Sequence, residues 1–385
     1  MTMNKRFESI VVGTGGFGSS CFYHLATRGV RVLGLDRFPA GHAQGSSHGD
    51  TRIIRQAYFE HPDYVPLLRR AYDQWRELEA WSGRELMKIC GLILAGPPAG
   101  EAVAGTRLAA KTHNLELHDV SSADLAREGE RRFPGFRVPD GFDVVVEPTG
   151  GYLQVEDCVR THIELACKAG AEHQSGATIV GWESDGRTVR VRTESDEYEA
   201  ASLILTPGAW ADHMLNDIAG MPTLHVLRKT MHWHQVRSSV YDVASGGQGF
   251  LFEMPYGAFY GFPSLEGSTL KLAEHSGGEA LTDPLLIDRS LRISDTKPIG
   301  RFLNEVMPDV DPQTGRHSVC MYTVTPDGHF IVDRHSEYDN VFFGAGFSGH
   351  GFKFTSVIGE ALAVLAIDGS TDQPIDFLGL SRFQT

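Results

Sequence analysis

The amino-acid sequence predicts an α/β protein that joins a doubly wound, parallel-sheet domain to a second, β-rich α+β domain. The first domain is indicated by a strand, a glycine-rich turn, a helix and a second strand, which follow one another over residues 8–38. The second is indicated by short apolar runs between Gly and Pro turns over residues 86–148, and by a strand-rich, aromatic stretch over 221–324. The length of 385 residues also favours two domains over a single core.

The composition narrows the class of protein. Hydrophobic residues make up 41% of the chain and charged residues 22%, as in globular proteins. The formal net charge of −14, with no basic block, disfavours nucleic acid as a partner. The first residues lack the long apolar stretch of an export signal, and no segment reaches the length of a membrane span. We therefore expect a soluble, cytoplasmic protein that does not act on a membrane.

The cysteines and histidines point to neither disulfides nor a bound metal. Five cysteines are an odd number, widely spread and without a CxxC pair, so we expect reduced thiols. The 17 histidines show no ligand-spaced cluster apart from His232 and His234. On a strand, that pair is expected to face solvent or the core. We therefore expect no metal.

The turn after the first strand carries the dinucleotide fingerprint Gly13-x-Gly15-x-x-Gly18. Gly13 allows the tight turn, Gly15 lets the backbone approach a pyrophosphate, and Gly18 lets helix and strand pack closely. Asp36 ends the second strand, about 20 residues after the glycines, where a carboxylate accepts a hydrogen bond from a ribose hydroxyl. A bare GxGxxG also occurs in ordinary loops, but the strand, helix and acid around this one favour a Rossmann-like nucleotide site.

A second glycine-rich loop, GAGFSGHGF at residues 344–352, distinguishes two possible cofactors. It places small residues, Gly346 and Gly349 among them, and free backbone N–H groups before a helix. Such a loop suits the flavin half of FAD, whereas a nicotinamide cofactor needs only the first fingerprint. Its alternative role is to cap the last helix. We predict FAD; an NAD(P)-dependent dehydrogenase and a non-catalytic flavin-binding protein are the alternatives.

The changes of pattern along the chain predict the domain boundaries. We expect a discontinuous Rossmann-like FAD-binding domain made of residues 1–85, 150–220 and 325–385. The second, β-rich α+β substrate domain is expected to consist of residues 86–149 and 221–324, inserted twice into the first.

The stretch GSSHGDTRIIR at residues 45–55 concentrates positive charge. If a helix begins at Ser47 or Asp50, His48, Arg52 and Arg55 lie on one of its faces. Like charges on one face destabilise a helix unless an anion lies opposite. The two isoleucines between the arginines suggest partial burial, and a buried guanidinium requires a partner such as a carboxylate or a reduced flavin. A solvated basic face is the alternative reading.

Four motifs carry a resemblance to a known family: GSSHGDTRIIR, FYGFPSLEGSTLKLAEH, VCMYTVTPDGHFIVD and GFSGHGFKF, in this order. The sequence resembles the monomeric sarcosine oxidase and N-methyltryptophan oxidase family, which are FAD-dependent amine oxidases of the D-amino-acid-oxidase-like superfamily. The similarity runs from the first strand to the last helix and is weakest around residues 95–145.

The resemblance implies roles for individual residues. The cysteine that carries the flavin through a thioether in that family matches Cys320, which by itself would be read as a small buried hydrophobic residue. The arginine and lysine that hold the substrate carboxylate match Arg55 and Lys353. A forked guanidinium and an ammonium together suit that task, because they fix the position and the orientation of a carboxylate.

Further matches complete the implied active site. Family residues that border the flavin match His48 and Arg52, and active-site aromatic residues match Tyr260 and Tyr322.

His275 matches a histidine beside the bound substrate, and Lys271 matches the lysine at which oxygen is activated. A fixed cation there would stabilise the negative charge that develops on oxygen. Taken alone, Lys271 on an alternating strand would be a solvent-facing lysine and His275 a surface residue. Only their joint occurrence within the family motif favours an active-site role for these two residues.

The implied reaction is the oxidation of an N-methyl amino acid by O2 to formaldehyde, the demethylated amino acid and H2O2, with FAD as the cofactor. Sarcosine, N-methyltryptophan and cyclic imino acids such as L-pipecolate remain open as substrates. The resemblance also implies a monomer.

Overall fold

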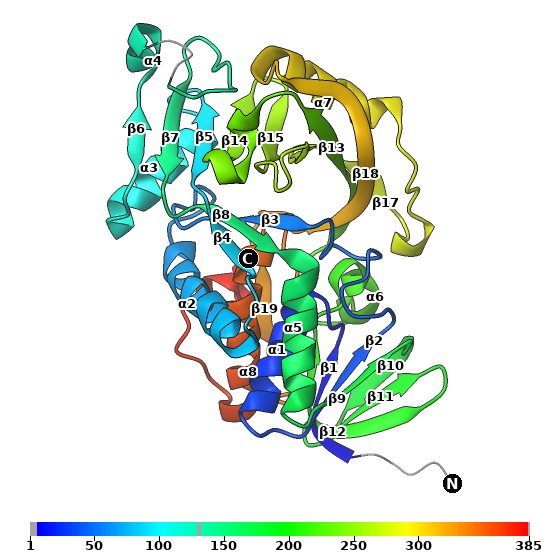
Figure 1. Ribbon diagram of the computed structural model, residues 1–385. Coiled ribbons are helices and arrows are strands. Elements are labelled where there is room, and N and C mark those ends of the chain that lie inside the picture. Colours follow the sequence, from blue (N-terminus) through cyan, green and yellow to red (C-terminus); the bar gives the residue numbers. More distant parts are fainter. Residues whose placement is uncertain (1–5, 129–131, 384–385) are drawn as a thin grey trace.

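A computed structural model of the protein describes residues 6–128 and 132–383. Figure 1 shows two lobes, each built on a large sheet, with a small sheet between them. Parallel strands dominate the sheet of the lower lobe and antiparallel strands dominate that of the upper lobe. This agrees with the predicted α/β class and with its β-rich second part.

The first large sheet has the strand order β10-β11-β12-β1-β2-β9, with β20 also paired to β12 and β19 paired to β20. Its strands are β1 Arg6–Val12, β2 Val32–Asp36, β9 Glu172–Ser175, β10 Ile179–Ser184, β11 Val189–Thr193, β12 Glu197–Leu205, β19 Ile331–Arg334 and β20 Val341–Ala345. The parallel pairs β12-β1, β1-β2 and β12-β20 form its centre. These strands are apolar on both faces, as expected where both faces are covered.

Helices cover one face of this sheet. They are α1 Gly16–Thr27, α2 Tyr64–Ser82, α5 Val155–Lys168 and α8 Thr355–Asp368. Alternate strand residues point to opposite faces, so Val11 and Ile204 pack against these helices whereas Ile10 and Leu203 pack on the other side. The hydrophobic cluster on the other face contains residues of β10 and β11, which are strands of the same sheet. The short helix α6 Ala211–Leu215 and the C-terminal segment around Leu380 complete this cluster.

The junction between β1 and α1 is close-packed. Gly13 has a φ of +83°, and a Cβ there would lie 2.4 Å from the carbonyl oxygen of Thr206. A Cβ on Gly18 would lie 1.8 Å from the carbonyl oxygen of Gly13. Each atom placed there would overlap the backbone, so both positions require glycine for the reasons that the fingerprint predicts.

The second large sheet has the order β17-β13-β16-β15-β14-β5-β7-β6, with β18 on the other side of β13. Its strands are β5 Leu92–Gly96, β6 His118–Val120, β7 Asp143–Glu147, β13 His225–Val236, β14 Gly249–Met254, β15 Gly257–Gly261, β16 Thr269–Glu274, β17 Glu279–Leu281 and β18 Val310–Val324. Helix α7 Ile293–Val306 packs on it through a cluster of phenylalanines. His232 and His234 on β13 are buried, so of the two expected environments they take the core.

The strands support the domain division that we propose. All strands of the first large sheet fall within residues 1–85, 150–220 and 325–385, and all strands of the second fall within 86–149 and 221–324. The region 86–149 is less β-rich than its sequence suggests, because helices α3 Glu101–His113 and α4 Ser122–Glu128 lie within it.

The third sheet corrects the prediction of a helix after Ser47 or Asp50. Residues Thr51–Ile54 form strand β3, which pairs with β8 Gly151–Gln154; β4 Met87–Ile89 pairs with the other edge of β8. Asp50 has a φ of +68°, which no helix accommodates. The carboxylate of Glu156 accepts hydrogen bonds from the N–H groups of Gly49 and Asp50 and holds this turn. Long-range pairing of a β-branched strand therefore outweighs the local spacing.

No helix within 6–128 or 132–383 is both long enough and apolar enough to cross a membrane.

The substitution Gly18→Ala tests the packing of the β1–α1 junction. The added methyl group overlaps the Gly13 carbonyl group, so we expect a loss of stability of about 1–3 kcal/mol and a lower flavin content in the purified protein. Thermal unfolding and flavin absorbance measure the two effects. The matched control is Gly300→Ala inside α7, where a Cβ meets nothing within 4 Å and should stabilise the helix by about 0.5–1 kcal/mol. Equal unfolding temperatures for the two variants would contradict the packing argument.

Candidate active site

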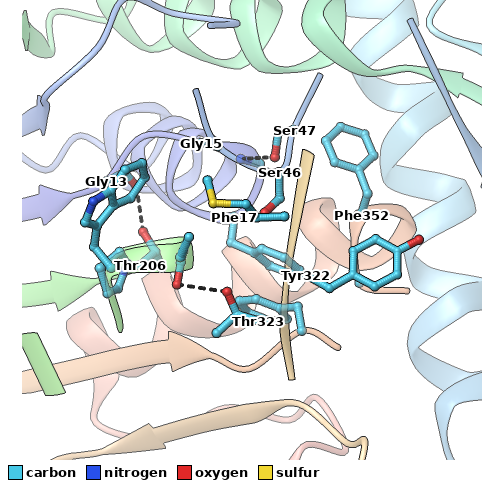
Figure 2. Close-up of a pocket in the computed structure, with 18 of the residues that line it drawn as sticks. Gly13, Gly15, Phe17, Ser46, Ser47, Thr206, Tyr322, Thr323 and Phe352 are labelled. Carbon is cyan, nitrogen blue, oxygen red and sulfur yellow. Dashed lines mark hydrogen bonds between the residues drawn. The ribbon is translucent and has the colours of Figure 1, made fainter. Parts of the chain in front are cut away.

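A cavity of about 540 Å³ begins at the β1–α1 turn and extends to the second large sheet. Figure 2 shows Gly13, Gly15 and Thr206 at one side of it, with Tyr322 and Phe352 at the other. Its walls come from segments far apart in the sequence, including the turn after β1, the loop at residues 41–47, strand β18 and the loop before α8.

The first turn of α1 makes one end of the cavity suitable for a phosphate. The N–H of Gly16 donates to Ser47 Oγ at 3.2 Å, and the Thr206 hydroxyl donates to the Gly13 carbonyl oxygen at 2.7 Å. A Cβ on Gly15 would meet nothing nearer than 4.0 Å, so its backbone faces open space. Helix N-termini of this kind bind phosphates because their N–H groups lack partners within the helix.

Asp36 lies at the end of β2, where the fingerprint places it. Its Oδ2 accepts a hydrogen bond from the Thr14 N–H at 2.7 Å, and its Oδ1 accepts one from the Phe38 N–H at 2.8 Å. A carboxylate has about four acceptor positions, so capacity remains for a ribose hydroxyl. Trp210 also lines the cavity nearby. The open glycine backbone and the carboxylate fit a dinucleotide.

The far end of the cavity is lined by aromatic rings. The His275 ring lies 5.6 Å from the Tyr322 ring and 6.2 Å from the Tyr260 ring, measured between centroids. Burial, with repulsion from His350 and Lys229, lowers the pKa of His275 to about 3, so this ring is neutral at physiological pH. Burial raises the pKa of Tyr260 and of Tyr322, so both hydroxyl groups keep their protons.

Arg55 lies in the wall at this end and is paired with an acid that the sequence reading missed. Its Nη2 lies 2.5 Å from Glu60 Oε2, and its guanidinium is 4.0 Å from the centroid of the Phe59 ring. Burial opposes ionisation of Glu60, but the charges of Arg55, His350 and Lys353 lower its pKa to about 2. The guanidinium is therefore neutralised by a carboxylate that an incoming carboxylate could replace.

Lys353 and Lys271 are buried ammonium groups that have no ion pair with any carboxylate in the described parts of the chain. Lys353 Nζ donates to the His350 carbonyl oxygen at 2.7 Å, and Lys271 Nζ donates to the carbonyl oxygens of Gly49 and Thr51 at 2.6 Å each. Burial lowers the pKa of Lys353 to about 7, reinforced by Arg55. Burial, reinforced by Arg52, lowers the pKa of Lys271 well below its usual value.

The structure brings most of the predicted residues to one cavity. Those that line it are Gly13, Gly15, Asp36, Arg52, Arg55, Tyr260, His275, Tyr322, Gly346, Gly349 and Lys353. Four predicted residues do not line it: Gly18, His48, Lys271 and Cys320. Gly18 serves packing, whereas Cys320 is buried directly before the lining residues Met321 and Tyr322.

His48 is buried behind the wall. Its Nδ1 lies 3.4 Å from Ser318 Oγ, and its Nε2 has no hydrogen-bond partner. Burial, with the charge of Arg52 as the next largest effect, lowers the pKa of His48 to about 3. Arg52 itself is on β3, and it donates from Nη2 to the Ser46 carbonyl oxygen at 2.8 Å. The predicted group of three positive charges therefore consists of two arginines and a neutral histidine.

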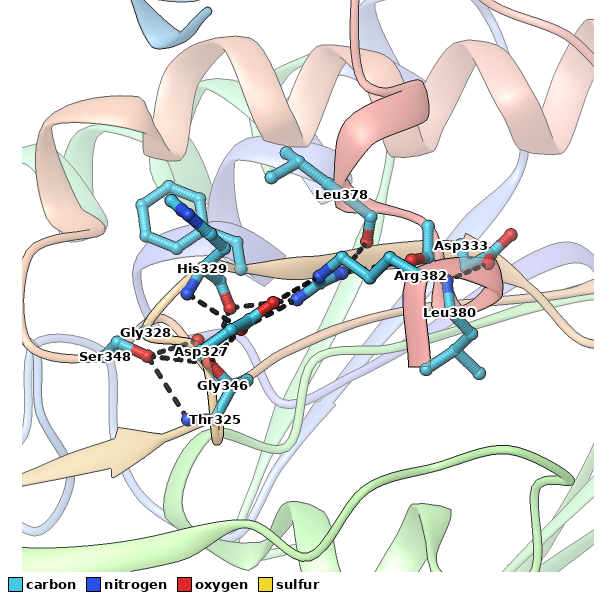
Figure 3. Close-up of polar contacts among 12 residues, drawn as sticks. Thr325, Asp327, Gly328, His329, Asp333, Gly346, Ser348, Leu378, Leu380 and Arg382 are labelled. Carbon is cyan, nitrogen blue, oxygen red and sulfur yellow. Dashed lines mark hydrogen bonds and ion pairs between the residues drawn. The ribbon is translucent and has the colours of Figure 1, made fainter. Parts of the chain in front are cut away.

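The loop with Gly346 and Gly349 is fastened from behind by a polar network (Figure 3). The Thr325 hydroxyl donates to the His329 carbonyl oxygen at 2.7 Å, and Ser348 Oγ donates to the Gly346 carbonyl oxygen at 3.0 Å. Arg382, near the C-terminus, pairs with Asp327 at 2.7 Å. These contacts fix the backbone that presents Lys353 and the glycines to the cavity.

Sequence reasoning missed three buried charges near the site: Glu60, Glu147 and Lys229. Glu147 Oε1 accepts from the Gln56 N–H at 2.5 Å, and its Oε2 accepts from the Ala57 N–H at 3.1 Å, so it holds the chain beside Arg55. A signal was available for Glu147, which is a charged residue at the end of the apolar run VVVE; the mostly polar run LRKTMHWH around Lys229 offers none. No three His, Cys, Asp or Glu side chains in the described residues form a group that could hold a metal ion.

The fold and the cavity define a flavoprotein oxidoreductase. The chain belongs to the FAD dependent oxidoreductase family, which its residues 8–365 match. FAD, the cofactor expected from the late glycine loop, is thus the cofactor of the family, and the nicotinamide alternative loses its support.

Two groups of relatives cover nearly the whole chain. The sequence is 38% identical to the monomeric sarcosine oxidase of Bacillus sp. (strain B-0618), over 99% of this chain and 97% of that one. It is 34% identical to the N-methyl-L-tryptophan oxidase of Yersinia pestis (strain Pestoides F), over 98% of this chain and all of that one. These identities confirm the resemblance carried by the four motifs.

Solved structures share the fold. NikD, described as an unusual amino acid oxidase essential for nikkomycin biosynthesis, has a TM-score of 0.85 and 23% identity, over 98% of each chain. L-proline dehydrogenase from P. horikoshii has a TM-score of 0.84 and 18% identity, over 99% of each chain.

Proposed function

We propose that the protein oxidises an N-methyl amino acid with O2 and water, giving the demethylated amino acid, formaldehyde and H2O2. The observation that carries the proposal is that Arg55 and Lys353 both lie over the Tyr58 ring, in the wall of a cavity that Tyr260 and His275 also line. The relatives are named as oxidases of sarcosine and of N-methyl-L-tryptophan, which supports the same substrate class.

The side chains divide the work. The guanidinium of Arg55 and the ammonium of Lys353 bind the substrate carboxylate, which takes the place of Glu60 on Arg55. The neutral His275 ring and the two tyrosine hydroxyls surround the amine, and the aromatic walls exclude water. FAD held by the glycine turn between β1 and α1 and by Asp36 would supply the redox chemistry, a two-electron oxidation of the substrate with O2 as the final acceptor. The Lys271 ammonium, held by two carbonyl groups, stabilises negative charge on oxygen.

His48 and Arg52 border the flavin in this proposal, and Cys320 carries it through a thioether. Cys320 precedes Met321 and Tyr322, which line the cavity, and it pairs with Lys229 across β13 and β18.

A second cavity favours substrates larger than sarcosine. It has a volume of about 320 Å³ and shares Phe59, Glu60, Leu251, His275 and His350 with the first. Space for a side chain therefore adjoins the carboxylate site. N-methyltryptophan and cyclic imino acids such as L-pipecolate are accordingly the second candidate substrates.

We also propose that the enzyme is a cytoplasmic monomer. All five cysteines are free in the structure, the state expected in a reducing compartment. The relative from Bacillus sp. (strain B-0618) is named a monomeric sarcosine oxidase, which supports the single chain.

Oxidation of a panel of amino acids tests the reaction and the role of Arg55. We expect sarcosine or N-methyl-L-tryptophan to give formaldehyde and H2O2 in equal amounts, whereas L-pipecolate would give H2O2 and a cyclic imine but no formaldehyde. Arg55→Met should lower kcat/KM by about a hundredfold, or roughly 3 kcal/mol, because it removes a charge-assisted pair. Sarcosinamide, which has no carboxylate, should be a poor substrate for both proteins. Equal activity of the wild type and the variant toward sarcosine would contradict the role of Arg55, and no peroxide from any compound would contradict the reaction.

Acid precipitation tests the flavin attachment. The yellow colour should stay in the protein pellet of the wild type and move to the supernatant for Cys320→Ser, because only a covalent bond survives unfolding. Cys90→Ser, which changes a half-buried cysteine outside the cavity wall, is the matched control and should keep its colour in the pellet. A yellow supernatant from the wild type would reject the thioether.

The pH dependence of carboxylate binding tests Lys353. Methoxyacetate has the shape of sarcosine but no titrating amine, and flavin absorbance reports its Kd. Below pH 7 Lys353 is protonated and attracts the anion, so Kd should be nearly constant. Above pH 7 each binding event must take up a proton, and Kd should rise by up to about tenfold per pH unit.

Lys353→Met should bind methoxyacetate weakly and lose this rise. Glu60 and His350, with pKa values lowered to about 2 and about 4, titrate outside the pH range of 6 to 9. A constant Kd for the wild type across that range would show that Lys353 does not bind the anion in its ammonium form.

A further inference from the structure

Lys229 is a third buried lysine, next to the cavity-lining residues Tyr322 and His275, and neither the family motifs nor the proposed reaction accounts for it. It lies on β13, opposite Cys320 on β18, and is 6% exposed. Its Nζ lies 5.3 Å from the centroid of the Tyr322 ring. No described carboxylate forms an ion pair with it.

The ammonium of Lys229 is fully used by one short turn. Its Nζ donates to the carbonyl oxygens of His275 at 3.0 Å, Ser276 at 2.6 Å and Gly277 at 3.1 Å. An ammonium has three N–H groups, so each of them has a partner. Burial of a charge without a counter-charge is unfavourable, and three carbonyl groups that converge on it offset this only while the turn keeps its shape.

That turn determines where the His275 ring lies. It follows β16, and the His275 N–H donates to the Ala258 carbonyl oxygen at 2.7 Å, which fixes the start of the turn. Ser276 Oγ accepts from the Ala258 N–H and donates to Glu274. The residues after it, Gly277 and Gly278, both have positive φ and impose little restraint of their own. Without the Lys229 ammonium as donor, the three carbonyl groups of the turn would lose their hydrogen bonds and would need water as a replacement partner.

The charged and titratable groups around the Lys229 ammonium are Glu274, Cys320, Tyr322 and His275. The Glu274 carboxylate attracts the Lys229 ammonium but forms no ion pair with it. The positive charge beside the turn is therefore not neutralised. The other two buried lysines of the described chain, Lys271 and Lys353, are held by carbonyl groups in the same way. Lys229 therefore shares the chemistry of residues to which the proposed reaction assigns a task.

We propose that Lys229 is a positioning residue, whose hydrogen bonds to the turn at residues 275–277 hold the His275 ring against Tyr322 at the amine end of the substrate site. This inference rests on the proposed function and adds to it a residue that sets the geometry of the site from behind. Loss of the ammonium would release the turn, and His275 would no longer face the bound substrate.

A double-mutant cycle tests whether Lys229 acts through His275. The holoenzyme variants are Lys229→Met, His275→Asn and the double variant, and the readout is the Kd of methoxyacetate from flavin absorbance at pH 6.5. We expect Lys229→Met to raise Kd at least tenfold in the wild-type background and less than twofold in the His275→Asn background. The value of kcat/KM for the best N-methyl substrate should follow the same pattern.

The same factor in both backgrounds would overturn the proposal, because a general loss of structure does not depend on His275. An unchanged Kd in Lys229→Met would overturn it as well. A wild type that neither binds methoxyacetate nor oxidises any N-methyl amino acid would overturn the proposed function and this inference together. The two failures are therefore distinguishable.

Two further variants keep the test decisive. Lys297→Met removes an exposed lysine from α7 in the same lobe and should change neither Kd nor the unfolding temperature. Should Lys229→Met fail to fold, Lys229→Gln replaces it in the cycle, because an amide keeps two N–H donors for the turn. We then expect a rise in Kd of about threefold that disappears in the His275→Asn background; equal rises in both would again overturn the proposal.

Discussion

Three buried lysines, one in the cavity wall and two outside it, are held by backbone carbonyl groups and are not paired with carboxylates. Lys229, Lys271 and Lys353 are each bound in this way. A carboxylate partner would stabilise each lysine more strongly, but it would cancel the positive field that an anionic substrate or a reduced flavin requires. Carbonyl dipoles satisfy the N–H groups and leave the charge in place. Arg55 differs from the lysines, because it forms an ion pair with Glu60, which the substrate carboxylate is proposed to replace.

These carbonyl groups come from three separate parts of the fold. Lys271, on the second large sheet, is held by the backbone of the small third sheet and the turn before it. Lys353 is held by the glycine loop that follows the first large sheet, and Lys229 by the turn after β16. Lys229 and Lys271 thus each fasten one segment to another, and Lys271 joins the second large sheet to the third sheet, whereas Lys353 is held within its own loop.

Local patterns were enough to predict the dinucleotide end of the site. Gly13 and Gly18 are required because a Cβ at either position would overlap the backbone around one strand–turn–helix unit, and Asp36 follows at a set spacing. The motif around Arg55 was recognised, but its helix was wrong, because the pairing of Thr51–Ile54 with β8 comes from a segment about a hundred residues away. Lys229 and Glu147 were missed, since a charged residue in a strand gives no sign of the carbonyl or N–H groups that will surround it.

The sequence by itself determined the α/β class, the nucleotide fingerprint, the cofactor and the family, because these depend on short-range periodicity and on motifs whose residues are neighbours in the chain. Only the tertiary structure decided which charges are buried, which of them are paired, and which turn each ammonium holds. Those properties depend on groups that meet through long-range packing, such as Lys229 with the turn after His275 and Glu147 with the backbone beside Arg55. Burial sets the protonation state of each group, and burial is a property of the whole fold.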